Sequence, residues 1–185
     1  MINVAIIGTA GRDKTVSKEM TSELFTKMIK KSKDIIENTF HLDPSTVILV
    51  SGGAAWSDHI VIKLFMENYI SNGLLYLPAQ WDSNNKKYAE DTSCGKISNY
   101  YHKMFSNKIK TNTLEEIDSC IKNGLMIDVQ FPGFFQRNSE IAKSDYLIAF
   151  SWSDLDYPTT GGTADTWKKT KTINKIHIPL NNLSI

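Results

Sequence analysis

Several features that identify whole classes of protein are scarce or absent in this sequence. Its 185 residues include two cysteines, Cys94 and Cys120, which are too few for a disulfide framework and lack the spacing of a metal site. No apolar run reaches the roughly 18 residues that are needed to span a membrane. The start of the chain, MINVAIIG, lacks the basic flank of a signal peptide. We therefore expect a soluble, cytoplasmic protein with no membrane partner and a single domain over residues 1–185.

Neither sign of charge is in excess, because 21 basic residues are balanced by 20 acidic ones. Bulk charge therefore gives no reason to expect non-specific binding of nucleic acid. Arginine is scarce: Arg12 and Arg137 are the only two, and every other basic residue is lysine. An arginine side chain binds phosphate or carboxylate through two parallel hydrogen bonds, which lysine cannot do. Both arginines stand beside the loops described below, so we expect them at a ligand site; two ordinary surface arginines are the alternative.

Apolar runs and helical patterns alternate along the chain. Strands are predicted at 2–7, 47–50, 74–77, 146–150 and 175–179, with a short extended piece at 126–131. Helices are predicted at about 17–39, 57–71, 95–108, 114–122, 135–145 and 162–170. This alternation indicates βαβ units and an α/β chain with a three-layer Rossmann-like fold, in which helices cover both faces of a mostly parallel sheet.

The segment 80–113 is polar and rich in aromatic residues, and it follows a predicted strand end. An insertion at this place either forms a lid over a ligand site or packs at the periphery as one helix held by its aromatic side chains. Both interpretations are compatible with the sequence.

The loop at 51–58 joins a buried strand to a helical pattern. Gly52 and Gly53 permit positive φ and a close approach of a ligand to the backbone, and Ser51 offers a hydroxyl to the same turn. Ser57 or Asp58 is expected to cap the following helix. Free amides and a helix N-terminus favour an anion. The loop therefore predicts an anion site, with a plain tight turn as the alternative.

Two further loops, at 8–12 and 159–163, also follow predicted strands. In a parallel sheet, ligands bind beyond the C-terminal strand ends, where the direction of the connections changes. We therefore expect all three loops to border one anion-binding pocket.

Several familiar motifs fail in detail. GTAGRDKT at 8–15 resembles a phosphate-binding P-loop with Lys14 and Thr15 in the expected places, but Asp13 stands where the last glycine should be. An ATPase interpretation is therefore rejected, and the same loop lacks the glycine spacing of a dinucleotide fingerprint. The four histidines are scattered, so no metal site and no cofactor is predicted. Ser51 has no visible base and is not predicted to be a catalytic serine.

Taken together, four segments resemble the SLOG superfamily, which includes the DNA-processing protein DprA and the LOG-type cytokinin-activating phosphoribohydrolases. They are the strand and GTAGR at 6–12, VSGGAAWSD at 50–58, QRNSEIAKSDYLIAF at 136–150 and GGTADTW at 161–167. Each segment is short, and their order is the specific part of the resemblance, which spans residues 2 to about 169. It implies a single SLOG-like, nucleotide-binding domain and a homodimer.

The resemblance also implies roles for individual residues. Main-chain amides in the second and last glycine loops, with one hydroxyl, would hold phosphate, and Arg137 would pair with it. Asp58 would cap its helix or contact a ligand hydroxyl. The ligand-binding residues expected on this basis are Gly8, Thr9, Arg12, Ser51, Gly52, Gly53, Asp58, Arg137, Gly161, Gly162 and Thr163.

The chain departs from these relatives at a catalytic position. LOG-type enzymes and the related nucleoside deoxyribosyltransferases carry a glutamate where this chain has Thr166. Cleavage of an N-glycosidic bond passes through an oxocarbenium-like state. A carboxylate must either stabilise this state or activate the water that attacks it. Asp165, one residue earlier, and Glu140, one turn beyond Arg137, are the candidate catalytic acids.

Three functions are therefore expected. The first is binding of a phosphorylated nucleotide or nucleotide-derived small molecule, with hydrolysis of its N-glycosidic bond. The second is a non-catalytic sensor or sponge of a signalling nucleotide, which the missing glutamate fits best. The third is a DprA-like module for single-stranded DNA, against which the near-zero net charge argues. The residues that would bind DNA are Lys86, Lys87, Tyr88, Lys96, Tyr100 and Tyr101.

Overall fold

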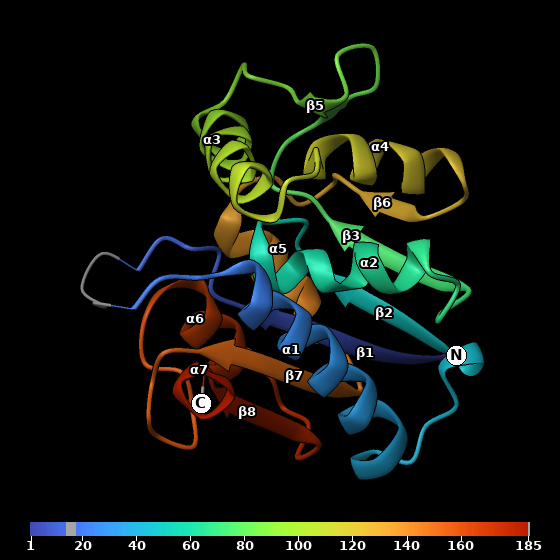
Figure 1. Cartoon of the computed structure of the whole chain (residues 1–185). Helices are drawn as coiled ribbons and strands as arrows, with labels where there is room; N and C mark the ends of the chain where they lie inside the picture. The colour runs from blue at the N-terminus through green and yellow to red at the C-terminus, as the bar shows by residue number, and fades with distance from the viewer. Residues whose placement is uncertain (14–17, 185) are drawn as a thin grey trace.

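One parallel sheet forms the middle layer of the molecule (Figure 1). The computed structural model describes residues 1–13 and 18–184. The sheet has six strands in the order β6-β3-β2-β1-β7-β8. Their bounds are β1 Ile2–Gly8, β2 Val47–Ser51, β3 Asn72–Tyr76, β6 Met126–Asp128, β7 Tyr146–Ser151 and β8 Lys175–Pro179.

The order of the strands creates a switch point beside β1. From β1 the chain adds β2, β3 and β6 on one side, and then returns to add β7 and β8 on the other. β1 therefore pairs in parallel with both β2 and β7, and the register with β7 places Gly8 opposite Phe150. The connections leave β1 and β7 in opposite directions, which opens a crevice at their C-terminal ends.

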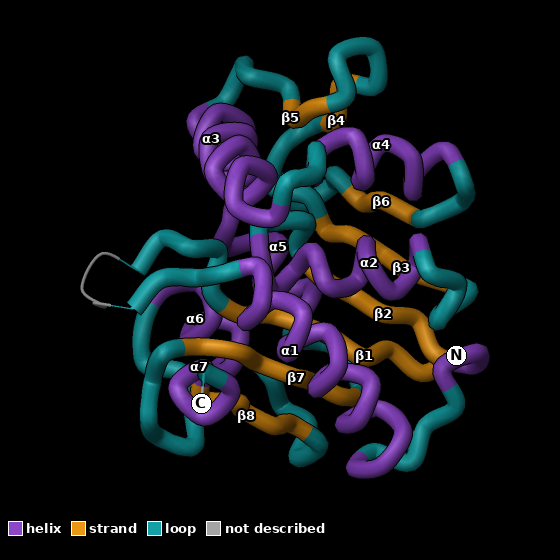
Figure 2. Tube along the Cα trace, viewed as in Figure 1, coloured by secondary structure: helices purple, strands orange, loops and turns teal. Residues whose placement is uncertain are grey.

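Helices cover both faces of the sheet, so the predicted three-layer α/β fold is confirmed (Figure 2). α1, α2 and α7 lie on one face of the sheet, and α5 and α6 lie on the other. α3 and α4 lie at the side of the molecule where β3 and β6 form the edge of the sheet. The bounds are α1 Ser22–Asp34, α2 Ile60–Met66, α3 Ser93–Ile109, α4 Thr113–Lys122, α5 Phe134–Ile141, α6 Gly161–Lys169 and α7 Leu180–Leu183.

Side-chain caps explain where three of these helices begin. Thr21, Thr92 and Asn112 precede α1, α3 and α4, and each side-chain oxygen accepts a hydrogen bond from a backbone amide three residues later. Such a bond satisfies one of the amides that a helix start leaves free, and is worth about 1 kcal/mol.

The strands are apolar on both sides because both sides are covered. Val4 and Ile6 of β1 belong to the core under α1 and α2, whereas Ala5 and Ile7 belong to the smaller core under α5 and α6. All four side chains are buried. A parallel sheet between two helical layers requires this continuous apolar pattern, which is the reason that the strands could be predicted.

Some predicted boundaries were wrong. The first helix begins at Ser22, and Ser17, where it was expected to start, lies outside the described residues. The second ends at Met66 because Asn68 is left-handed, with φ 58°. The segment 80–113 contains α3 and also a small unpredicted hairpin, β4 Trp81–Asp82 and β5 Lys87–Tyr88. None of the described helices is both long and apolar enough to cross a membrane.

Candidate functional site

A cavity of about 720 Å³ lies at the C-terminal end of β1, at the switch point of the sheet. Its volume falls within the range of about 300–1,000 Å³ that is usual for small-molecule sites. It is bordered by the loop after β1, by Ala54, Ala55 and Asp58 of the segment after β2, and by parts of α3, α5 and α6. The predicted site residues that line it are Gly8, Thr9, Arg12, Asp58, Arg137, Gly161, Gly162, Thr163 and Asp165.

The second glycine loop does not have the role expected of it. Asp58 turns its carboxylate back onto the loop, and its Oδ2 accepts hydrogen bonds from the backbone amides of Gly52 and Ala54, both at 3.1 Å. The chain's own carboxylate thus occupies the anion position. Gly52, Gly53 and Ser51 do not line the cavity, which corrects the expectation that this loop holds phosphate.

The expected helix cap is also wrong. Residue Ala55 occupies the cap position before the helical turn Trp56–His59, and it makes no side-chain bond. Ser57 instead donates its hydroxyl to the backbone oxygen of Thr9, at 3.0 Å. The buried Ser51 hydroxyl donates to the backbone oxygen of Asp58, at 3.0 Å. These bonds fix the second loop to the first one.

Arg137 is held against this loop. Its Nη1 donates to the backbone oxygen of Gly52 and lies 3.7 Å from Oδ2 of Asp58. Both side chains are buried. Burial raises the pKa of Asp58, while the Arg137 charge and the two amide bonds oppose this rise. Among the described residues, the buried Nε of Arg137 has no hydrogen-bond partner.

Both arginines lie against the same aromatic ring. The guanidinium carbon of Arg137 is 5.3 Å from the centre of the Phe134 ring, and that of Arg12 is 5.6 Å from it. Arg12 also lies 5.2 Å from the ring of Tyr101, on α3. Such distances are those of cation–π contacts. The structure therefore brings together two arginines that are 125 residues apart in the sequence.

The segment 80–113 packs into the core through its helix and also contributes to the wall of the cavity. Phe105 of α3 is buried in the main core, as a peripheral packing helix requires. Ile97, Ser98 and Tyr101 of the same helix form one wall of the cavity. α3 therefore lies where a lid was expected.

The first turn of α6 faces the cavity through Gly161, Gly162 and Thr163. The first amides of a helix have no carbonyl partner within the helix, and they carry the positive end of its dipole. Thr160, at the cap position, makes no side-chain bond to these amides. Gly161 has φ 68°, which few other residues adopt readily, so glycine suits this turn.

The two candidate acids are in different places. Asp165 lines the cavity, and its Oδ2 accepts hydrogen bonds from Asn138 at 3.1 Å and from Lys169 at 2.9 Å. Glu140 does not line it and pairs with Lys143 at 2.7 Å, so its assignment to the site is corrected. Thr166 is buried at the edge of the cavity and donates its hydroxyl to the backbone oxygen of Gly162 at 2.9 Å.

The first loop is closed on itself. The Thr9 hydroxyl donates to the Asp13 carboxylate and accepts the amide of Gly11 at 3.1 Å. Lys14 and Thr15, which completed the resemblance to a P-loop, lie outside the described residues. In the parts of the chain that the structure describes, no three His, Cys, Asp or Glu side chains are grouped so that they could hold a metal ion.

Tyr88 cannot stack on a base of single-stranded DNA, as the DNA-binding hypothesis required. Its side chain is fully buried and donates its hydroxyl to the backbone oxygen of Gly53 at 2.6 Å. It therefore has no face on which a base could stack.

Several cavity residues were not predicted from the sequence, and Phe134 and Asn138 are the two that lie closest to Arg137 along α5 with a readable signal. Both flank Arg137 within FFQRN, and a helix brings residues three or four positions apart onto one face. The sequence signal for Phe134 was its spacing of three residues from Arg137, and the signal for Asn138 was its position next to Arg137.

Comparison with known proteins gives one informative match. No protein-family model matches the chain, and no solved structure matches it. The chain is similar to "Uncharacterized protein R261" of Acanthamoeba polyphaga mimivirus, with 41% identity over 187 aligned residues. The alignment covers 100% of this chain and 97% of the viral protein.

Proposed function

The chain belongs to the same family as that mimivirus protein, and we propose for it the function that its cavity supports best: binding of a phosphorylated nucleotide or a nucleotide-derived small molecule. The observation that carries this proposal is the meeting of both arginines and the first turn of α6 around one cavity at the switch point of the sheet. The resemblance to the SLOG superfamily supports the same ligand class.

The phosphate is placed at the start of α6 and beside Arg12. Amides and the dipole at the first turn of α6 favour an anion, and Thr163 adds a hydroxyl. Arg137 already faces Asp58, whereas no carboxylate among the described residues pairs with Arg12. Arg12 is therefore the cation whose charge is available to a phosphate.

The base and sugar are placed against the aromatic side of the cavity. Tyr101, Phe134 and Phe135 line it and offer aromatic surface to a planar base, beside the cations that each ring already contacts. Asp165 and Asn138, which bond to each other at 3.1 Å, also line the cavity and offer polar atoms to a sugar hydroxyl. An apolar wall with a few converging polar groups is the usual composition of a small-molecule site.

Isothermal titration with AMP, GMP, CMP and UMP, and with the matching nucleosides, tests the proposal. We expect at least one monophosphate to bind about tenfold or more tightly than its nucleoside, because a charge-assisted hydrogen bond contributes about 1.5–3 kcal/mol. The Arg12→Met variant should lose this difference, whereas Glu140→Gln, outside the cavity, should keep it. Equal affinity for nucleosides and monophosphates, or an unaffected Arg12→Met variant, would refute the proposal.

Hydrolysis of the bound nucleotide is the second candidate function, and the position of Asp165 favours it. The Asp165 carboxylate would accept a proton from water as the water oxygen bonds to the anomeric carbon. The N-glycosidic bond breaks, and the proton taken up by Asp165 passes to the leaving base, directly or through solvent, so that nucleotide and water give a free base and a ribose phosphate and the carboxylate is restored. Free base released by the wild type and by Glu140→Gln, but not by Asp165→Asn, is the expected result.

A ligand that is recovered intact after long incubation would exclude hydrolysis and leave the binding proposal standing. Thr166 supports this sensor or sponge alternative, because its hydroxyl is already bonded to its own helix where related enzymes carry a glutamate.

A further inference from the structure

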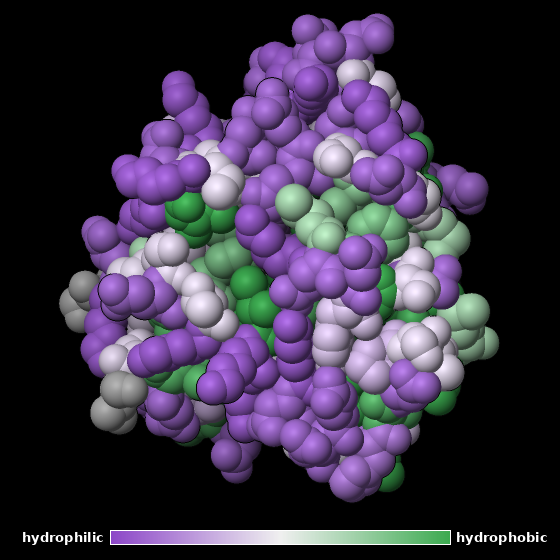
Figure 3. Space-filling model, turned by 45° about the vertical axis from the view of Figure 1, so that its right-hand side comes forward, coloured by the Kyte–Doolittle hydropathy of each residue, from purple (hydrophilic) through white to green (hydrophobic). Residues whose placement is uncertain are grey.

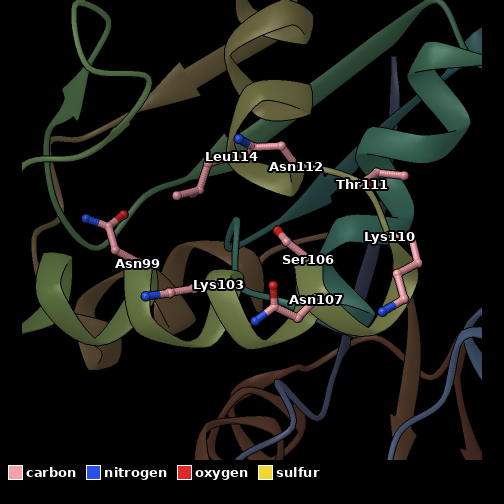
Figure 4. Close-up of a pocket in the computed structure, with 8 residues that line it drawn as sticks. All are labelled: Asn99, Lys103, Ser106, Asn107, Lys110, Thr111, Asn112 and Leu114. Atoms are coloured by element: carbon pink, nitrogen blue, oxygen red, sulfur yellow. The ribbon is translucent and has the colours of Figure 1, made fainter.

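A second hollow lies on the opposite side of α3 from the cavity. It is a groove of about 760 Å³ between α3 and the start of α4. Lys103, Asn107 and Lys110 line it from one side, and Asn112 and Leu114 from the other (Figure 4). Consecutive residues of a helix are rotated by about 100°, so this face of α3 points away from Tyr101 and the cavity.

Three lysines follow this face of α3 at equal intervals. Lys96, Lys103 and Lys110 are seven residues apart in the sequence. Lys96 and Lys103 lie on α3, where seven residues correspond to two turns and about 10.5 Å, and Lys110 is the left-handed residue that ends the helix. Lys103 and Lys110 line the groove, and Lys96 lies one step along α3 from it. All three are exposed, and within the described residues none has a carboxylate partner. Lys108, on another face of the same helix, differs because it pairs with Glu19 at 3.1 Å. The row of lysines therefore carries charge that the chain itself does not balance.

Glu90 carries a carboxylate beside this face, but it is paired with Lys87 at 3.8 Å and accepts a hydrogen bond at 3.0 Å from Asn99, which lines the groove. No acidic residue lines the groove itself. Glu116 lies behind Thr111, but it is bonded to Lys63 at 2.7 Å and to His59 at 3.2 Å. The surface of this end of the molecule, formed by the β4–β5 hairpin, α3 and α4, is mostly hydrophilic (Figure 3). The groove thus presents two lysines, three asparagine side chains, two hydroxyls and one apolar side chain, Leu114.

We propose that the groove between α3 and α4 docks an acidic α-helix of a partner protein. A helix that lies along α3 and carries carboxylates seven residues apart repeats at the same 10.5 Å, about two turns, and so meets Lys96 and Lys103 in register, while Lys110 lies just past the end of α3. An apolar residue between these carboxylates would contact Leu114. This proposal does not depend on the ligand of the cavity.

Single-stranded nucleic acid is the other polyanion that could match the lysines, and the groove fits it less well. Binding of single strands combines positive charge with aromatic rings on which bases stack. No aromatic side chain lines the groove. Tyr100, the exposed aromatic residue of α3, lies outside it.

Fluorescence anisotropy with three labelled probes tests the proposal. The first is a 21-residue helical peptide that carries glutamate at every seventh position with leucine beside it. The second has the same composition, with the glutamates distributed around the helix. The third is a 15-nucleotide oligo-dT. We expect the first peptide to bind about tenfold or more tightly than the second, and more tightly than the oligonucleotide, because several ion pairs form together only in register.

Charge-reversed variants locate the binding. Lys96→Glu/Lys103→Glu/Lys110→Glu should weaken binding of the first peptide by about tenfold or more. A control variant makes the same change of charge at exposed lysines on other elements: Lys30→Glu/Lys168→Glu/Lys171→Glu. It should bind as the wild type does. If the triple variant unfolds at a lower temperature than the wild type, the single variant Lys103→Glu replaces it, and a smaller loss of affinity for the first peptide is expected.

Three results would overturn the proposal. They are equal binding of the two peptides, equal loss in both triple variants, or tighter binding of the oligonucleotide that the groove variant abolishes. The last result would make this face a nucleic-acid site.

Discussion

Replacement of Asp58 tests whether a buried carboxylate holds the second loop together. Its Oδ2 accepts the amides of Gly52 and Ala54 and lies 3.7 Å from Arg137. Asp58→Ala leaves two buried amides without an acceptor and a buried guanidinium without a counter-charge. Breaking such a buried pair costs about 3–5 kcal/mol, and we expect the free energy of unfolding to fall by that amount.

Asp58→Asn should cost clearly less. Because both amides donate to the same oxygen, the single side-chain oxygen of asparagine can accept both bonds. What is lost is the charge facing Arg137. At about 4 Å and an effective dielectric constant of about 20, that attraction is about 4 kcal/mol before the cost of desolvation. We expect a net loss of about 1–3 kcal/mol.

A double-mutant cycle in chemical denaturation measures this interaction. The cycle combines Asp58→Asn with Arg137→Met, and we expect a coupling energy of about 2 kcal/mol. A matched cycle on Glu140 and Lys143 uses a shorter pair, 2.7 Å, whose lysine is 70% exposed. There the coupling should stay below about 1 kcal/mol because solvent screens the pair.

Two outcomes would contradict the reasoning. One is equal coupling in the two cycles, which would mean that burial does not strengthen the pair at Asp58. The other is an Asp58→Asn variant as unstable as Asp58→Ala, which would mean that its oxygen does not hold the two amides.

Three further predictions concern stability. Burial lowers the pKa of His102 to about 3, so below about pH 6.5 the unfolded chain takes up a proton that the folded chain does not. The free energy of unfolding should therefore fall by about 2 kcal/mol between pH 8 and pH 5. Chemical denaturation at several pH values should show a smaller fall in the His102→Gln variant. Tyr88→Phe removes one of two buried donors to the Gly53 carbonyl, which also contacts Nε2 of His102 at 2.9 Å; because the carbonyl keeps that second bond, the variant should cost only about 0.5–1 kcal/mol in urea unfolding, and a loss above about 2 kcal/mol would contradict this reasoning. Gly95→Ala places a Cβ against the backbone oxygen of Ala89 and should cost about 1–3 kcal/mol, whereas Gly162→Ala, also in a first helical turn but with its nearest atom at 3.4 Å, should cost less than about 0.5 kcal/mol; thermal unfolding compares the two.

The sheet could be predicted because its strands are buried on both faces. Ile2–Gly8 and Tyr146–Ser151 read as continuous apolar runs, and parallel order places their C-terminal ends together. The loops at 8–12 and 159–163 follow those ends and line one cavity for that reason. The hairpin β4–β5 and the four-residue α7 were missed because two to four residues carry no measurable periodicity.

The parts of the site that could not be predicted depend on contacts between distant segments. Tyr101 meets Arg12 only because the chain folds α3 over the end of β1, and neither residue carries a local signal of the other. The expected homodimer stays a prediction, as does membership of the SLOG superfamily.

The second loop borders the cavity as expected, through Ala54, Ala55 and Asp58, but its glycine amides do not face it, and the reason is local. A serine-glycine-glycine turn that is followed by an aspartate suits a bound anion, and it suits equally well an aspartate that turns back to take the anion's place. Asp58 does the second, at 3.1 Å from two amides. The loop therefore has a structural role. The backbone oxygen of Gly52 accepts a hydrogen bond from Arg137, and the Ser57 hydroxyl donates one to the backbone oxygen of Thr9 in the first loop. Because its amides are already satisfied, an anion that enters the cavity finds free donors at the start of α6 and at Arg12, and the ligand must orient its phosphate toward them.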